Sequence, residues 1–284
     1  MMTTPITDAE VAAYHEQGFH IAPGLVSPAE VEALRADTLH ICRGGYPHPK
    51  LETMPADTTD DEALRSFLCI HFPHKISQIM EETGVCHAGI SHVLSRIIGP
   101  DVKCMQSMLF IKPPGFQGQA WHQDEIYIPT RDQSLTGAWI ALDDATVENG
   151  CLYVLPGSHK GVLYDQRPHE HPDEFDFAAE SFGFEDSAEI PVEVKTGDVV
   201  FFNGYLLHRS RKNRSDVFRR VLVNHYMNAW SRLPWQTAEG EPAAQADYRD
   251  IVMVAGEDPY AWRGTEDRAD ISLRQCQALT QQDA

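Results

Sequence analysis

The spacing of apolar residues along the chain changes near residue 100. Before that point they recur at helical intervals, as in the segment 90–97. Two short helices are predicted between residues 7 and 41, because Thr7 and Ser27 are each followed three residues later by a glutamate, the capping-box pattern of a helix start. Between them GFHIAPGLV predicts a strand or turn. From about Asp60 to Gly99 the pattern is helical again.

After Pro100 the apolar residues alternate with polar ones, which is the period of a β-strand. Turn residues such as PPG at 113–115 and ENG at 148–150 separate the runs. Short strands divided by Gly and Pro turns are typical of a sandwich or barrel, so we expect a mainly β chain with N-terminal and flanking helices. The apolar runs lie at 102–112, 119–128, 137–142, 151–155, 190–194, 198–207 and 219–228.

The 284 residues are predicted to form one domain. Its parts are a mainly helical segment at about 7–100, a β core at about 101–230 and a C-terminal tail at 237–284. Residues 164–189 interrupt the core with an acidic stretch that lacks alternation, which predicts a long loop acting as a lid. The tail is polar and acidic with one predicted helix near Ile271 to Leu279, and no chemistry is assigned to it.

One apolar run, 119–128, contains side chains that could bind a metal ion. If 119–128 is a strand, alternation places His122 and Asp124 on one face among apolar neighbours. A buried imidazole beside a buried carboxylate is costly unless something satisfies both, and a divalent metal does so directly. The best third ligand is His208, which follows the strand-like run GDVVFFNGYLL. Two His and one carboxylate form the facial triad of non-haem Fe(II) oxygenases. The alternative is an ordinary His–carboxylate hydrogen bond.

Composition narrows the class of partner. The 23 Lys and Arg against 42 Asp and Glu give a net charge of -19, which disfavours nucleic acid and anionic membranes. The six cysteines are scattered without a CxxC pair, which fits free thiols in a reducing compartment. The N-terminus is polar and acidic, and no apolar run approaches the roughly 20 residues that span a bilayer. We therefore predict a cytoplasmic protein with a small-molecule substrate, while its oligomeric state stays undetermined.

Four longer motifs resemble the phytanoyl-CoA dioxygenase family. They are HQDEIYIP at 122–129, GAWIALDDATVENGCLYVLPGSHKG at 137–161, GDVVFFNGYLLHRS at 197–210 and FRR at 218–220. The resemblance covers roughly residues 7 to 230 and includes the N-terminal TDAEVAAYHEQGF. It implies a double-stranded β-helix of jelly-roll type with iron ligands at His122, Asp124 and His208, and with 2-oxoglutarate and O2 as cosubstrates.

The same resemblance implies which residues hold 2-oxoglutarate. In the family an Arg eleven residues after the distal His binds the far carboxylate, and this spacing points to Arg219. Alternation alone does not choose between Arg219 and Arg220. A guanidinium suits the role, since it can grip a carboxylate through two parallel hydrogen bonds. Further positions carried over from the family are Ser210, Trp139, Met108 and Gln106, and a basic residue that is left open among His71, His74 and Lys75.

The function predicted from these features is hydroxylation of an unactivated C–H bond with release of succinate and CO2. Desaturation, cyclisation or epoxidation at the same site stays open. An alternative of another class is a cupin-like protein that holds zinc and is not an oxygenase. The spacing of Arg219 after His208 speaks against it, because such a protein has little need for an inward Arg there.

Overall fold

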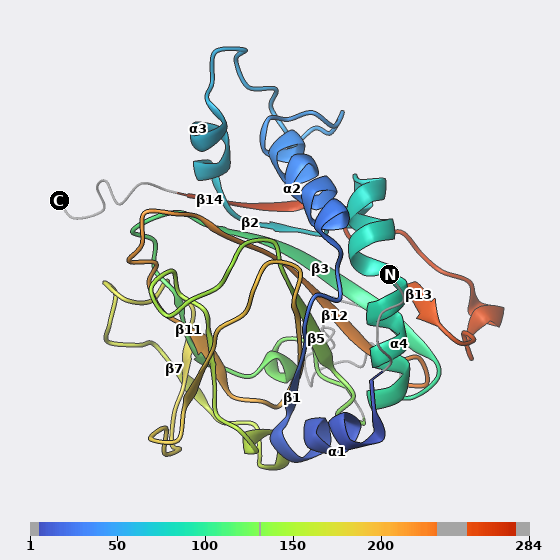
Figure 1. Cartoon of the computed structure of the whole chain (residues 1–284). Helices are drawn as coiled ribbons and strands as arrows, with labels where there is room; N and C mark the ends of the chain where they lie inside the picture. Colours follow the sequence, from blue (N-terminus) through green and yellow to red (C-terminus); the bar gives the residue numbers. More distant parts are fainter. Residues whose placement is uncertain (1–5, 131, 232–248, 277–284) are drawn as a thin grey trace.

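The computed structural model describes residues 6–130, 132–231 and 249–276, and two antiparallel sheets form its centre (Figure 1). The larger sheet has eight strands in the order β1-β10-β5-β12-β3-β2-β14, with β13 also paired to β3, and the smaller sheet has four in the order β4-β11-β6-β9. β7 and β8 form a separate hairpin. The larger sheet runs from β1 to β14 without closing into a barrel in the described residues.

The strands of this mainly β fold are short, apart from two in the middle of the larger sheet. Those two, β3 (Val102–Lys112) and β12 (Arg219–Asn228), pair along their whole length. The others are β1 (Phe19–Ala22), β2 (Phe67–His71), β4 (Gln119–His122), β5 (Thr136–Ala141), β6 (Leu152–Val154), β7 (Gln166–Arg167), β8 (Glu180–Ser181), β9 (Ile190–Val192), β10 (Val199–Asn203), β11 (His208–Ser210), β13 (Val252–Ala255) and β14 (Ser272–Gln275).

The helices precede most of the strands, and the predicted capping boxes are confirmed. Thr7 accepts from the Glu10 amide and Ser27 from the Glu30 amide, while each glutamate side chain accepts from the capping residue in return. The helices are α1 (Asp8–Gln17), α2 (Pro28–Cys42), α3 (Asp60–Arg65) and α4 (Ala88–Ile97). Single turns are η1 (Pro73–Lys75), the π-helix η2 (Met80–Val85), η3 (Asp124–Ile126), η4 (Ser158–Lys160) and η5 (Ala261–Arg263).

Alternation along β12 divides the core into two layers. Leu222 and Tyr226 belong to the apolar cluster that includes residues of α2 and α4, whereas Val221 and Val223 belong to the cluster shared with the smaller sheet. Residues of β12 with odd numbers therefore face the space between the sheets. This register decides which side chains reach the site.

Three sequence predictions of secondary structure are wrong. The run 119–128 is not one strand, because β4 ends at His122 and the Asp124 carbonyl accepts from the amides of Tyr127 and Ile128 in a turn. The helical reading of 60–99 misses β2, which pairs with β3. The C-terminal helix is replaced by β14, which pairs with β2, and residues 277–279 of that prediction lie outside the described residues. In each case a neighbouring strand or turn overrides the local pattern.

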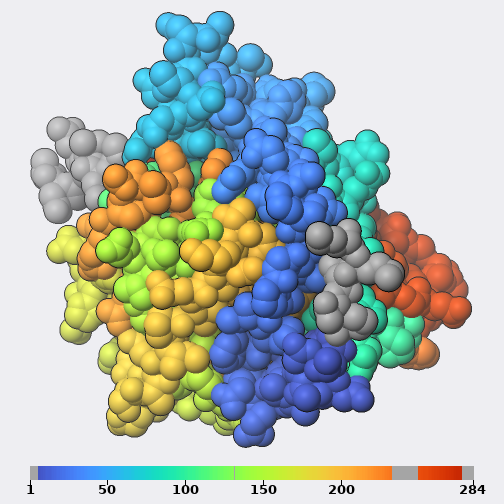
Figure 2. Space-filling model, viewed as in Figure 1, coloured from blue at the N-terminus to red at the C-terminus, as the bar shows by residue number. Residues whose placement is uncertain are grey.

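The N-terminal segment packs along the chain near η4 and β10. Figure 2 shows it in blue against the yellow-to-orange part of the chain, and β1 pairs with β10. The Lys160 ammonium donates to the Glu16 carboxylate at 2.5 Å. No helix of the described residues is long and apolar enough to cross a bilayer.

Candidate metal centre

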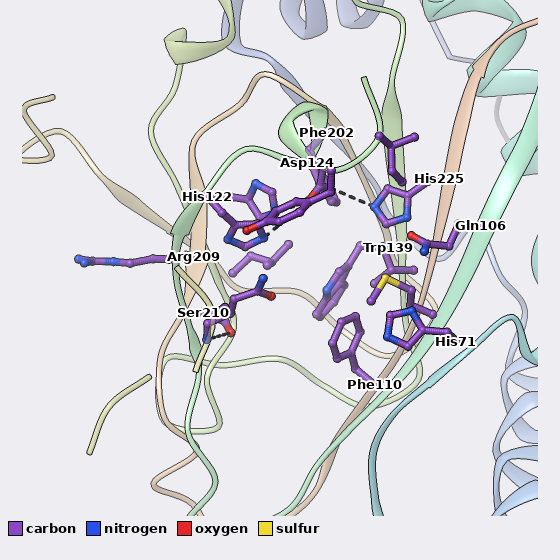
Figure 3. A pocket seen from close by; sticks show the side chains of 18 of the residues that line it. His71, Gln106, Phe110, His122, Asp124, Trp139, Phe202, Arg209, Ser210 and His225 are labelled. Atoms are coloured by element: carbon purple, nitrogen blue, oxygen red, sulfur yellow. Dashed lines mark hydrogen bonds and ion pairs between the residues drawn. The ribbon is translucent and has the colours of Figure 1, made fainter. Parts of the chain in front are cut away.

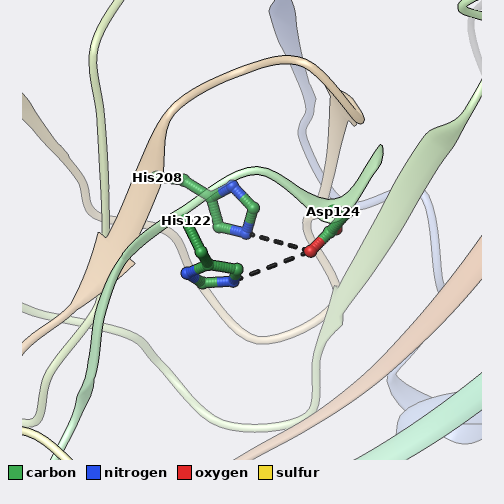
Figure 4. Close-up of side chains that lie close together, drawn as sticks. All are labelled: His122, Asp124 and His208. Atoms are coloured by element: carbon green, nitrogen blue, oxygen red, sulfur yellow. Dashed lines mark ion pairs between the residues drawn. The ribbon is translucent and has the colours of Figure 1, made fainter. Parts of the chain in front are cut away.

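Three side chains predicted as ligands converge between the sheets (Figure 4). His122 ends β4 and pairs in register with His208 at the start of β11, so the two imidazoles lie 4.1 Å apart between ring centroids. Asp124 enters from the turn η3, and its Oδ1 lies 3.6 Å from His122 Nε2 and 3.7 Å from His208 Nε2. All three side chains are buried. The structure thus brings the three predicted residues together, although Asp124 arrives by a turn instead of by strand alternation.

The hydrogen bonds of the two imidazoles fit a metal ion. His122 Nδ1 donates to the Ala120 carbonyl at 2.8 Å and His208 Nδ1 to the Leu206 carbonyl at 2.9 Å. Each proton is thereby held on Nδ1, which leaves the Nε2 atom of each ring, close to Asp124 Oδ1, free to bind a metal ion. Burial and the nearby His208 lower the pKa of His122 to about 3, so this ring is neutral, as a ligand must be. Two imidazole nitrogens and one carboxylate oxygen suit Fe(II) with open positions.

The triad lines a cavity of about 450 Å³ that also contains every other predicted site residue (Figure 3). Its walls are largely apolar, with a few polar groups among them, which is the usual composition of a small-molecule site. Gln166, Ala178 and Ala179 of the segment 164–189 form part of the lining. The predicted lid segment therefore lies at this cavity, and Gln166 Nε2 donates to the Tyr127 hydroxyl at 2.9 Å.

Arg219 enters the cavity as a buried cation. It is 4% exposed, its Nε has no hydrogen-bond partner, and no carboxylate among the described residues pairs with it. Its guanidinium carbon lies 5.5 Å from the centre of the Trp139 ring. Burial lowers the pKa of Arg219 to about 10, so the group stays charged at neutral pH. A buried charge without a partner is costly, and the carboxylate of a bound ligand would supply one.

Ser210 is oriented to donate its hydroxyl proton. Its Oγ accepts from the Gln119 amide at 3.2 Å and from the Lys112 amino group at 3.1 Å. Because a hydroxyl oxygen accepts two hydrogen bonds, the remaining capacity of Ser210 is its own O–H. Lys112 is itself fixed, since it also donates to the Arg211 carbonyl at 2.7 Å. Ser210 and Arg219 thus offer complementary donors to one carboxylate.

We expect Ser210→Ala to raise the dissociation constant of 2-oxoglutarate about 10-fold, because a hydrogen bond to a charged group contributes about 1.5 kcal/mol. Anaerobic titration of the iron-loaded protein measures this. The control is Ser215→Ala, whose hydroxyl bonds Asn213 and does not line the cavity. An unchanged constant in the Ser210 variant would contradict the assigned donor.

The aromatic and apolar candidates line the same wall. Trp139 of β5 and Met108 of β3 both pair in register with Val223 of β12, so all three side chains face the cavity. Gln106 lies opposite His225 in the same ladder. The structure therefore places these residues around the cavity, and their roles stay predictions.

The structure distinguishes between the three basic candidates that the sequence left open. His71 lines the cavity and pairs in register with Met108. The buried His74 ring is hydrogen-bonded to the Ser107 hydroxyl at 2.5 Å, and Lys75 is paired with Asp250 and Asp267 of the C-terminal segment. Only His71 of the three is available to a ligand in the cavity.

Two residues of the site were missed in the sequence. His225 donates from Nε2 to Asp124 Oδ2 at 3.0 Å, and Lys112 holds Ser210. Alternation could have found both, since His225 follows Val221 and Val223 on the face of Arg219, and Lys112 follows Gln106 and Met108 on β3. Alternation gives no sign that these groups contact site residues.

Three arginines that follow His208 form ion pairs within the protein. Arg209 and Arg211 both donate to the Glu189 carboxylate, at 2.5 and 2.7 Å, and Arg214 pairs with Glu174. The Arg209 guanidinium stacks on Trp121 and points away from the other lining side chains in Figure 3. These cations are therefore poor candidates for attracting an anionic substrate.

The family model and the related sequences all indicate one family. The model described as phytanoyl-CoA dioxygenase (PhyH) matches residues 14–221. Phytanoyl-CoA dioxygenase 1 of Oryza sativa subsp. japonica is 34% identical over 171 residues, which cover 58% of this chain and 60% of the rice protein, less than two thirds of it. The peroxisomal phytanoyl-CoA dioxygenase of Bos taurus is 31% identical over 231 residues, which cover 76% of this chain and 67% of that protein.

Comparison with solved structures shows a shared fold. The apo form of the non-haem monooxygenase ThoJ has a TM-score of 0.65 at 20% identity, covering 87% of this chain and 84% of that one. The epimerase SnoN, solved with Fe3+, alpha ketoglutarate and nogalamycin RO, has a TM-score of 0.64 at 19% identity, covering 89% of this chain and 92% of its own. At this identity the likeness extends to the fold alone.

Proposed function

Because this chain belongs to the phytanoyl-CoA dioxygenase family of 2-oxoglutarate-dependent non-haem iron enzymes, we propose that it hydroxylates an unactivated C–H bond of a small molecule, with release of succinate and CO2. One observation carries the proposal. A single cavity contains both a triad of two histidines and one carboxylate and a buried guanidinium without a carboxylate partner in the described residues. A zinc hydrolase would need the triad but would have no use for that guanidinium.

Each residue has a defined task in this proposal. Iron(II), when bound, supplies the coupling of O2 reduction to oxidative decarboxylation of 2-oxoglutarate and the oxidising power for C–H cleavage. His122, Asp124 and His208 would hold the ion. Arg219 and Ser210 bind and orient the far carboxylate of the cosubstrate. The apolar walls and the segment 164–189 exclude water from the cavity.

We further propose that the substrate is not a polyanion and therefore is not a coenzyme A thioester. The segment 164–189, which contributes to the wall of the cavity, contains nine Asp or Glu against one Arg. The cations next to the site are occupied by Glu189 and Glu174. A nucleotide with several phosphates would therefore meet a repulsive surface.

The free cysteines bear on the compartment in which we propose that the protein works. All six cysteines are free in the structure, and Cys42, Cys69, Cys104 and Cys151 are buried. Burial raises the pKa of Cys69 well above its usual range, which keeps the thiol protonated and unreactive. This supports the proposal that the protein works in a reducing compartment such as the cytoplasm.

The test is anaerobic addition of Fe(II) and 2-oxoglutarate to the metal-free protein. We expect a visible charge-transfer band, followed on admission of O2 by succinate formation. In a screen for stimulated succinate release, natural-product scaffolds without phosphate groups should act and phytanoyl-CoA should not. Absence of the band would contradict the enzyme assignment, and stimulation by phytanoyl-CoA would contradict the substrate class alone.

A further inference from the structure

The carboxylate of Asp124 has one oxygen for the metal and one for another partner. Oδ1 faces the two imidazoles at 3.6 and 3.7 Å, whereas Oδ2 accepts from His225 Nε2 at 3.0 Å (Figure 3). We infer that His225 is a positioning residue that holds Asp124 as a one-oxygen ligand. This inference rests on the proposed function, because it concerns the geometry of the same metal centre.

Asp124 needs such a partner because of where it lies in the fold. His122 and His208 sit on strands that pair with each other, and their rings are further fixed through Nδ1. Asp124 lies in the turn η3, outside the sheet. In the described part of the chain, His225 is the one hydrogen-bond partner of its carboxylate. Rotation about the carboxylate bond is therefore limited chiefly by His225.

His225 is well placed for this role. It lies in the middle of the sheet, with β12 flanked by Gln106 of β3 and Gly137 of β5, and it is 4% exposed. Its Nδ1 has no hydrogen-bond partner in the described residues. A proton on Nδ1 would be a buried donor without an acceptor, so the proton sits on Nε2 and is donated to Asp124.

Strand β12 thus contributes residues to both the proposed cosubstrate site and the proposed metal site. Arg219 and His225 project from the same face of β12, one toward the proposed cosubstrate carboxylate and the other toward the metal ligand. A one-oxygen carboxylate leaves three positions of a six-coordinate metal open, enough for a chelating 2-oxo acid and O2. If Asp124 rotated to bind through both oxygens, one of those positions would be lost. His225 therefore keeps that position open and also supports metal affinity.

The inference is tested with His225→Gln, His225→Asn and His225→Phe in the full chain. The glutamine amide can replace the Nε2 donor, whereas asparagine is shorter and phenylalanine has no donor. His74→Phe is the matched control, because His74 is a buried histidine that bonds Ser107 and does not line the cavity. The readouts are Co(II) affinity from its visible absorption, the band formed with Fe(II) and 2-oxoglutarate, and the melting temperature of the metal-free protein.

We expect Co(II) affinity to fall about 10- to 100-fold in His225→Phe and His225→Asn, and to stay within about threefold of wild type in His225→Gln and His74→Phe. The iron band should weaken in the same order. Equal affinities for the Gln and Asn variants, or wild-type affinity in the Phe variant, would overturn the inference. If His225→Phe does not fold, the comparison of Co(II) affinity between His225→Gln and His225→Asn still tests the inference. Wild-type protein that binds Co(II) without forming the iron band would contradict the proposed function and not the role of His225.

Discussion

An Asp124→Ala variant is expected to lose both metal binding and turnover, with succinate formation below about one-hundredth of wild type. Removing a first ligand should cost more than the 10- to 100-fold typical of a residue behind it. Asp124 is also the only carboxylate in the cluster of potential metal ligands found among the described residues. Anaerobic titration with Fe(II) and 2-oxoglutarate, followed through the visible band, measures the loss.

The control for this variant is Asp132→Ala, since Asp132 accepts from Ser134 in the loop that follows. Both variants should keep the melting temperature of the metal-free protein within a few degrees, which separates loss of metal from loss of fold. A full iron band in Asp124→Ala would refute the facial triad. The protein would then have to bind its metal elsewhere.

Arg219→Met is expected to raise the dissociation constant of 2-oxoglutarate by at least about 30-fold. The metal-free variant should be as stable as the metal-free wild type, or more stable. Truncating one partner of a buried, hydrogen-bonded charge pair costs about 2 to 5 kcal/mol, and about 2 kcal/mol corresponds to about 30-fold. In the absence of ligand, the same guanidinium is buried without a carboxylate from the described residues. Replacing it by an apolar side chain of similar length removes that cost.

The neighbouring Arg220 provides a matched control on the opposite face of the strand. It donates to both oxygens of Asp143 at 2.8 Å, outside the cavity. Arg220→Met should therefore lower the melting temperature and leave the affinity for 2-oxoglutarate unchanged, the reverse of Arg219→Met. Isothermal titration and thermal unfolding of both variants measure the two effects. If Arg220→Met lowers the affinity for 2-oxoglutarate instead, the assignment of Arg219 is wrong.

The local sequence was sufficient to predict the structure where interactions between nearby residues determine it. The capping boxes at Thr7 and Ser27 were predicted because each is made by residues three apart. The change of period near residue 100 also coincides with the start of β3 at Val102, although β1 and β2 of the same sheet lie before it. Motif spacing was equally informative, because His122, Asp124 and His208 meet as expected.

The alternation of apolar and polar residues gave a wrong prediction at the point where the chain leaves strand β4. The pattern from 119 to 128 is compatible with a strand, but the strand that pairs with β11 ends after four residues, at His122. The turn at Asp124 forms because its carbonyl bonds amides three and four residues ahead, and periodicity does not report that competition. The candidate ligand Asp124 was thus placed beside His122 by a partly incorrect argument.

The sequence by itself determined the fold class, the three candidate ligands and, through spacing, the candidate anchor Arg219. The tertiary structure alone decided that Arg220 pairs with Asp143, that His71 lines the cavity in place of His74 or Lys75, and that His225 contacts Asp124. The physical reason is sequence distance. His225 and Asp124 are 101 positions apart, and only the pairing and register of the strands and the turn at Asp124 bring such groups within hydrogen-bonding range.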